Sequence, residues 1–106
     1  MAESMQAKAN KRIRGEILIL AKSGYPIPVE IRTLASSLLD RNITTTSEIT
    51  PHIDYLVGKG YLQFIDQDAI ERLLKGIISP NAFVKLTPKG VDLIDGHIDA
   101  DPGVDA

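Results

Sequence analysis

Two segments constrain the fold of this chain more than any others: residues 49–62, ITPHIDYLVGKGYL, and residues 83–94, FVKLTPKGVDLI. In the first segment, four apolar side chains share one face of a helix: Ile49, Ile53, Leu56 and Val57. The glycines on either side of Lys59 end that helix, and the apolar run 61–65 predicts a strand. The second segment predicts a strand over 83–86 and a helix that opens at Pro88 and runs to about Asp95.

A long helix is expected near the N-terminus, from Ser4 or Met5 to Lys22, with Gly24 as a left-handed cap. Its main apolar stripe consists of Ile13, Ile17, Leu20 and Ala21. Leu18 and Ile19 lie off this stripe, so the C-terminal half of the helix is apolar on more than one side. A helix of this kind is buried on more than one side, and the second side could be covered by a partner subunit.

Two prolines exclude a helix over 25–28 and leave at most a short strand near Ile27. A second helix is expected over 29–40, with the inward stripe Ile31, Leu34, Ala35, Leu38 and Leu39.

The start of the third helix has two interpretations. Thr45 and Glu48 have the spacing of a capping box, whereas a cap at Thr50 would put Pro51 at its preferred first position. The earlier start is favoured because Ile49 continues the apolar stripe, and the helix is therefore predicted over 45–59.

Residues 66–82 are long for the loop of a hairpin. Five apolar residues recur there at helical spacing: Ile70, Leu73, Leu74, Ile77 and Ile78. They predict a short helix over about 67–75 with a covered apolar face. In the competing interpretation, a plain hairpin pairs Ile77 and Ile78 with Phe83 and Val84.

The net charge of −2 conceals a basic body. Five of the 14 acidic residues lie towards the ends of the chain: Glu3, Asp95, Asp99, Asp101 and Asp105. Residues 5–92 hold all 12 basic residues and the other nine acidic ones, a charge of about +3. We therefore predict one domain over 1–96, followed by a flexible acidic tail over 97–106. A charge of this sign permits binding to nucleic acid without requiring it.

The succession xLxxKGYL and then xKLTPKGxxLI resembles winged helix-turn-helix regulators of the MarR, PadR and ArsR kind. The runs GYPIPVEIRTLASSLLDRN, HIDYLVGKGYL and DADPGV are similar to small winged-helix proteins of Mu-like phages and prophages. The resemblance covers about residues 8–95. It implies a mainly α (α+β) fold with a three-helix core, a β-hairpin wing and a C-terminal helix.

The function that this resemblance implies is DNA binding by a transcriptional regulator, with the helix 45–59 in the major groove. From that helix and its N-terminal turn, the candidate contacts are Thr45, Thr46, Ser47, Glu48 and His52. The candidate phosphate contacts elsewhere are Lys11, Arg12, Arg14, Lys59, Arg72, Lys75, Lys85 and Lys89. The outer face of the helix has no Arg or Lys, which favours the alternative of a protein-interaction module that does not bind DNA.

A homodimer is expected, joined through the first helix and the helix over 88–95. No catalytic constellation is present in the sequence, so we expect no enzyme activity. Cysteine is absent, which excludes disulfides. The two histidines, His52 and His97, are far apart with no carboxylate at metal-ligand spacing, so neither a metal nor another cofactor is expected. The N-terminus lacks the apolar core of a signal peptide, which predicts a cytoplasmic protein without a membrane span.

Overall fold

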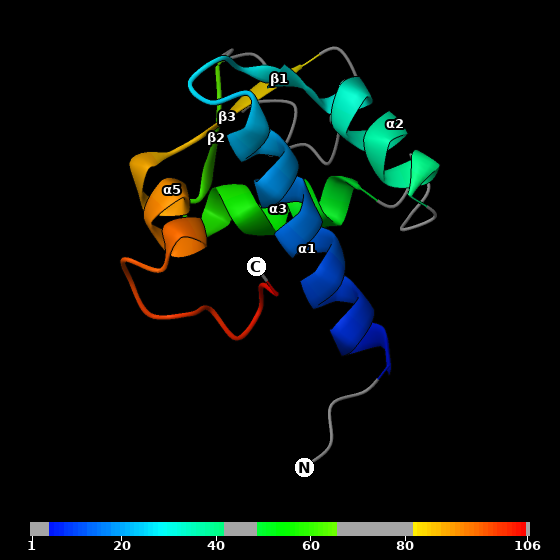
Figure 1. Cartoon of the computed structure of the whole chain (residues 1–106). Helices are drawn as coiled ribbons and strands as arrows, with labels where there is room; N and C mark the ends of the chain where they lie inside the picture. Colours follow the sequence, from blue (N-terminus) through cyan, green and yellow to red (C-terminus); the bar gives the residue numbers. More distant parts are fainter. Residues whose placement is uncertain (1–4, 42–48, 66–81, 106) are drawn as a thin grey trace.

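The computed structural model describes residues 5–41, 49–65 and 82–105, which form an α+β fold (Figure 1). In this part of the chain, four helices accompany a three-stranded antiparallel sheet. In chain order the elements are α1 (Met5–Ser23), β1 (Val29–Glu30), α2 (Ile31–Asp40), α3 (Thr50–Gly58), β2 (Leu62–Phe64), β3 (Phe83–Leu86) and α5 (Pro88–Asp95). The predictions for Thr45, Thr46, Ser47 and Glu48, and those for 66–81, lie outside the described residues.

The sheet has the strand order β1-β3-β2, so the last strand in sequence lies in the middle. Val84 on β3 pairs with Val29 on one side and with Phe64 on the other. Because side chains alternate along a strand, Val84 and Leu86 point inward with Leu62 and Phe64 of the neighbouring strand. The opposite face carries Phe83 and Lys85.

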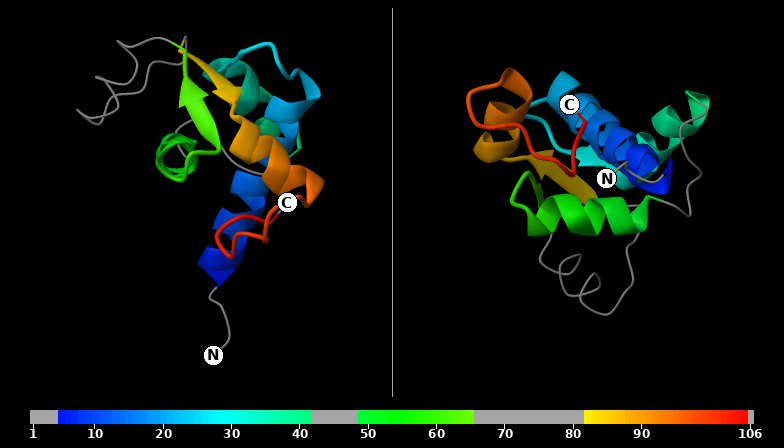
Figure 2. Two further views of the ribbon diagram at one scale, coloured as in Figure 1. Left: turned by 90° about the vertical axis from the view of Figure 1, so that its left-hand side faces the viewer. Right: turned by 90° about the horizontal axis from the view of Figure 1, so that it is seen from below.

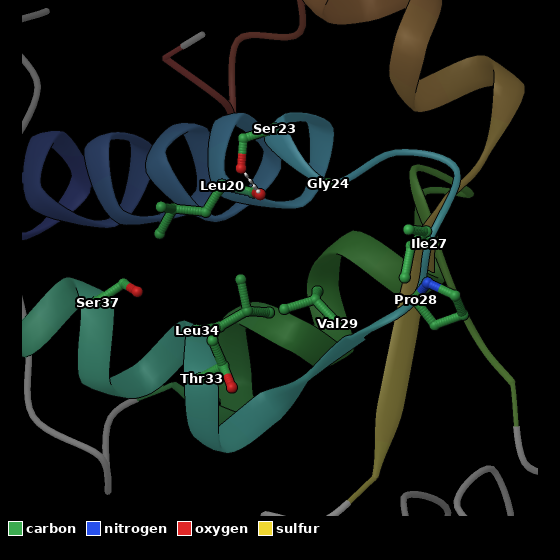
Figure 3. Close-up of a pocket in the computed structure, with 9 residues that line it drawn as sticks. All are labelled: Leu20, Ser23, Gly24, Ile27, Pro28, Val29, Thr33, Leu34 and Ser37. Atoms are coloured by element: carbon green, nitrogen blue, oxygen red, sulfur yellow. Dashed lines mark hydrogen bonds between the residues drawn. The ribbon is translucent and has the colours of Figure 1, made fainter.

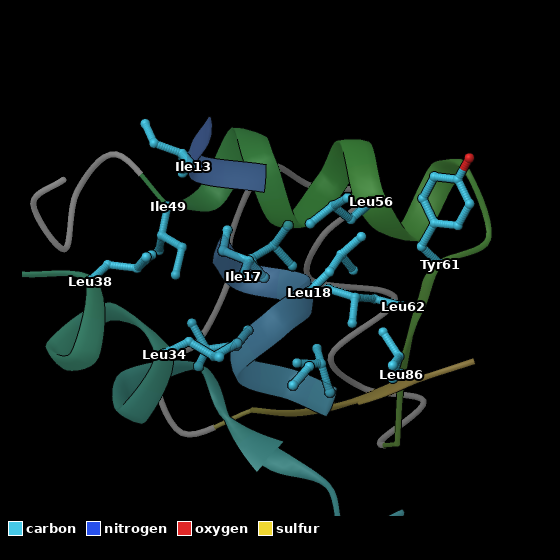
Figure 4. Packing of buried hydrophobic residues seen from close by; sticks show 14 of the residues in the cluster. Ile13, Ile17, Leu18, Leu34, Leu38, Ile49, Leu56, Tyr61, Leu62 and Leu86 are labelled. Carbon is cyan, nitrogen blue, oxygen red and sulfur yellow. The ribbon is translucent and has the colours of Figure 1, made fainter. Parts of the chain in front are cut away.

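Helix α1 lies at the centre of the fold and contacts α2, α3, α5 and β3. Ile17 and Leu18 have no exposed surface, and Figure 4 shows them among buried side chains of α2, α3, β2 and β3. Burying an aliphatic side chain of this size contributes about 1.5–3 kcal/mol. The predicted burial of α1 on two sides is confirmed, but the chain itself covers Leu18. Of the two side chains on which the expected dimer depended, only Ile19 is exposed, at 42%.

The two opening motifs of the sequence meet in the structure. Gly60, with φ of 84°, ends α3, and the Tyr61 N–H donates back to the Leu56 carbonyl at 3.0 Å. The Thr87 N–H donates to the Tyr61 carbonyl at 3.0 Å, and the Thr87 hydroxyl donates to the Gly60 carbonyl. The same Thr87 hydroxyl caps α5 by accepting from the Gly90 N–H at 3.1 Å. The KGYL and TPKG segments thus form one junction.

Several predicted boundaries need correction. Helix α3 begins at Thr50, not at Thr45, and Pro51 lies in its first turn, where the missing N–H removes no helical hydrogen bond. Helix α2 begins at Ile31 because Val29 and Glu30 form β1, so the short strand lies later than Ile27. Gly24 is also not the expected left-handed cap, because among the described residues only Gly60 and Gly96 are glycines with positive φ.

Candidate nucleic-acid interface

The exposed side of α3 carries Pro51, Asp54 and Gly58, and its buried side carries Ile53 and Leu56. His52 was expected to face DNA, but it is only 6% exposed. It lies one turn before Leu56, so packing against the core also covers His52. The prediction of His52 as an accessible contact residue is therefore wrong. Over residues 50–58, the exposed side of α3 presents an acid and no base.

Arg14 is a residue of α1, and its side chain lies against Tyr55 of α3. Its guanidinium carbon is 3.7 Å from the centroid of the Tyr55 ring, and it donates to the Gly103 carbonyl at 3.2 Å. This side chain is half-buried between a helix and the C-terminal segment. The predicted phosphate contact is thus held by a cation–π contact and a hydrogen bond within the protein.

Lys59, at the end of α3, lies beside the carboxylate of Asp101. The Lys59 ammonium is 3.5 Å from Asp101 Oδ2, and the Lys59 side chain is 46% exposed whereas that of Asp101 is 4% exposed. Asp101 also accepts from the Tyr61 hydroxyl at 2.6 Å and from the Gly103 N–H at 2.7 Å. The carboxylate therefore has three donors around it.

The C-terminal segment 97–105, which we call the tail, lies against the rest of the protein. The sequence predicted a flexible acidic tail, whereas Asp101 and Val104 are buried in the structure. Figure 2 shows the tail leaving α5 and returning to the N-terminal half of α1, where the Asp105 N–H donates to the Lys11 carbonyl at 3.0 Å. The difference arises because Val104 is apolar and Asp101 finds hydrogen-bond donors.

Four predicted contact residues lie at the tail or beside residues that contact it, and we call them the cationic row: Lys11, Arg14, Lys59 and Lys89. Arg14 and Lys59 reach the tail with their side chains, whereas Lys11 contacts it through its backbone carbonyl. Lys89, on α5, extends the row because its ammonium donates to the Lys59 carbonyl at 3.0 Å and lies 5.2 Å from the Tyr61 ring centroid. Three helices that are distant in sequence thus bring their cations to one border.

The other predicted cations are placed differently. Arg12 is exposed on the same half of α1 as Lys11. Lys85 lies on the outer face of the sheet, 5.8 Å from the centroid of the Tyr25 ring. Arg72 and Lys75 belong to the segment that the structure does not describe.

The environment of Asp101 and Tyr61 shifts both pKa values. Burial acts to raise the pKa of Asp101, but the hydrogen bonds from Tyr61 and the Gly103 N–H, with the charge of Lys59, outweigh it and leave the pKa below its ordinary value. Burial, followed by the hydrogen bond to Asp101, raises the pKa of Tyr61 to about 12. At neutral pH the pair is therefore a carboxylate that accepts from a neutral phenol.

Sequence reasoning missed Asp101, Tyr61, Tyr55 and Gly103 as parts of this border. The available signal was Val104, an apolar residue that follows the Asp-Pro-Gly turn sequence inside an acidic stretch. A Cβ at Gly103 would overlap the Tyr55 hydroxyl, so the tail backbone lies directly on that ring.

A cavity of about 250 Å³ lies between the end of α1 and α2 (Figure 3). Its lining consists of Leu20, Ser23, Gly24, Ile27, Pro28, Val29, Thr33, Leu34 and Ser37. None of these side chains titrates near neutral pH, so the cavity offers apolar surface and hydroxyl groups, without an acid–base pair.

Within residues 5–41, 49–65 and 82–105, no group of three or more His, Cys, Asp or Glu residues could hold a metal ion. No helix in this part of the chain combines the length and the apolar character that a membrane span requires. No family model, no curated protein and no solved structure matches the chain.

Proposed function

We propose that this protein is a winged-helix DNA-binding protein that acts as a transcriptional regulator in the cytoplasm. Support comes first from architecture, because the succession α3, β2, β3, α5 is consistent with the recognition helix, two wing strands and last helix expected of a winged helix. In such a fold α3 enters the major groove, and the strands β2 and β3 belong to the wing.

The cationic row is the observation that carries the proposal. Arg14 lies on the Tyr55 ring of α3, Lys59 directly follows α3, and Lys89 donates to the Lys59 carbonyl. Lys11 lies one turn before Arg14 on α1. Positive side chains gathered in this way neutralise phosphates, which supplies most sequence-independent affinity for DNA. The described exposed side of α3 presents Asp54 and no base, so the proposed binding depends on the backbone more than on base edges.

Salt dependence tests this proposal. Fluorescence anisotropy with a labelled duplex would give affinity as a function of salt concentration for the whole chain. Each phosphate contact contributes about 0.9 to the slope of log affinity against log salt. The double variant Lys11→Ala, Lys59→Ala should therefore flatten the slope by about 2.

The matched control is the double variant Lys22→Ala, Arg41→Ala, which removes the same charge. Lys22 is paired with Asp95 and Arg41 with Glu16, and neither belongs to the cationic row. Equal slopes for the two double variants, or no binding at low salt, would contradict the proposal.

A second candidate function, a protein-interaction module without a DNA role, is favoured by exposed apolar side chains near the outer face of the sheet. Ile65 and Phe83 are cross-strand neighbours, 51% and 44% exposed. Ile27 is 71% exposed in the loop that precedes β1. If the unmodified chain bound no duplex at low salt, and the double variant Ile65→Ser, Phe83→Ser abolished capture of a protein partner, this second function would be preferred.

The proposal includes a homodimer through α1 and α5. Its support is Ile19, an exposed aliphatic side chain on α1. Light scattering should report a dimer for the unmodified chain and a monomer for Ile19→Glu. A monomer for both would remove the dimer while leaving DNA binding to be judged by the salt slope.

A further inference from the structure

Apart from His97 at its start, the tail is attached to the body only near its end. Residues 96–100 are all exposed, whereas Asp101 and Val104 are buried. His97 stays on α5, where its N–H donates to the Asp92 carbonyl at 2.8 Å, and beyond it the attachment consists of the contacts of residues 101–105 with α1, α3 and Tyr61. Residues 98–105 can therefore leave the surface without disturbing any strand or helix described above.

The tail and the cationic row have opposite charges. Asp99, Asp101 and Asp105 are acidic, and the tail contains no Lys or Arg. Asp101 forms an ion pair with Lys59, the Gly103 carbonyl accepts from Arg14, and the Asp105 N–H donates to the Lys11 backbone carbonyl. The Asp101 carboxylate therefore occupies a position beside Lys59 where a phosphate of a nucleic acid would be neutralised.

Asp101 shows the chemistry of the covered site most clearly. Its oxygens take a hydroxyl hydrogen bond from Tyr61 at 2.6 Å and an ion pair with Lys59 at 3.5 Å. The ammonium of Lys89 lies over the same Tyr61 ring. One phosphate oxygen has the charge and the acceptor capacity to replace this carboxylate.

We propose that the tail is an intramolecular competitor that occupies a phosphate-binding site formed by Tyr61, Lys59 and Arg14. A phosphate group displaces Asp101 from Tyr61 and Lys59, and departure of the Gly103 carbonyl frees one guanidinium N–H of Arg14. This inference deepens the proposed function, on which it rests for the identity of the ligand as DNA. The anion site itself does not depend on that identity.

Amide spectra of four isotope-labelled whole chains test the proposal: the unmodified protein, Asp101→Asn, Val104→Ser and Asp99→Asn. Asp101→Asn removes the competing charge, and Val104→Ser loosens the same segment without a change of charge. Asp99→Asn is the matched control, because it changes the net charge as Asp101→Asn does but alters an exposed residue with no role in the site. Each chain is titrated separately with inorganic pyrophosphate and with a short duplex.

Pyrophosphate should perturb the Lys59, Tyr61 and Arg14 amides at several-fold lower concentration in Asp101→Asn and Val104→Ser than in the other two chains. Equal responses of Asp101→Asn and Asp99→Asn would show an effect of net charge alone and overturn the proposal. A melting curve checks that each variant is folded, and if Asp101→Asn fails this check, Val104→Ser decides.

The duplex arm separates the two claims. If pyrophosphate prefers the loosened variants but the duplex binds none of the four chains, the anion site stands and the proposed function fails. If the duplex binds all four chains with equal affinity, DNA binding stands and competition by the tail is overturned.

Discussion

Two distant segments return to the end of α3, and they are held there in different ways. At the first junction, Thr87 binds the backbone of Gly60 and Tyr61, and a Cβ at Gly90 would overlap the Tyr61 carbonyl. At the second junction, Asp101 reaches Tyr61 and Lys59 through side chains. The first junction is a close contact with the backbone, whereas the second junction consists of a hydrogen bond and an ion pair between side chains.

The first junction therefore holds the fold together, whereas the second junction is a contact that a ligand could replace. The backbone contacts at Thr87 fix β3 and α5 relative to α3, and no outside ligand could reproduce them. The partners of Asp101 outside the tail are a phenol and an ammonium, and a phosphate can accept from both. Breaking the first junction should therefore destabilise the fold, while breaking the second should cost less and change which ligands bind.

Gly90→Ala should have the largest effect. The new Cβ would collide with the Tyr61 carbonyl and the Leu86 side chain, and forced overpacking of this kind costs about 1–3 kcal/mol. Denaturant unfolding measures the loss. Gly58→Ala is the matched control, because nothing lies within 4 Å of its Cβ, and it should leave stability equal or higher. Equal losses for both variants would show that the first junction is not closely packed.

Tyr61→Phe should have the next largest effect. It removes one donor from a carboxylate whose side chain is 4% exposed, which costs about 1–2 kcal/mol in unfolding free energy. Tyr25→Phe, at an exposed tyrosine, should change stability by less than about 0.5 kcal/mol. A loss for Tyr61→Phe as small as that for Tyr25→Phe would mean that the second junction contributes nothing to stability.

The pH dependence of stability should have an alkaline limb from Tyr61. The pKa of this phenol is raised from 10.0 to about 12, so its contribution is complete below pH 10 and is lost as the pH rises towards 12. Ultraviolet titration should find that Tyr61 ionises late, and Asp101→Asn should move this ionisation to lower pH. A Tyr61 phenol that titrates near 10 would contradict the assignment.

An acid limb should come from Asp101, which faces Tyr61 and Lys59. Its pKa is lowered in the folded state, so its contribution is present above the unfolded value near 3.8 and is lost as the pH falls through the folded value. Acid unfolding of Asp101→Asn should lack this component, whereas Asp99→Asn should keep it.

The central elements could be predicted because their signals are local. The strand Phe83–Leu86 and the helix Pro88–Asp95 have the predicted bounds, since β-alternation and a Thr-Pro cap depend on neighbouring residues alone. The start of α3 was predicted too early because Pro51 allowed two starts, and the apolar stripe did not distinguish between them.

The candidate site was harder to predict because it depends on contacts across the chain. Periodicity shows that Leu18 needs a cover, but it does not show whether the same chain supplies it. Composition marks residues 97–106 as polar and acidic, yet the return of Asp101 to Tyr61 depends on a fold already formed. Arg14 and His52 were expected to be accessible because periodicity does not show which parts of the chain pack over them, and in the structure packing covers both, His52 almost completely.

The most direct test of the account is a map of amide perturbations on adding a short duplex to the unmodified chain at low salt. We predict that the largest changes occur at the cationic row, together with Gly103 and Val104 as the tail leaves the surface. Changes confined to Ile65, Phe83 and their neighbours on the outer face of the sheet, or no changes at all, would contradict it.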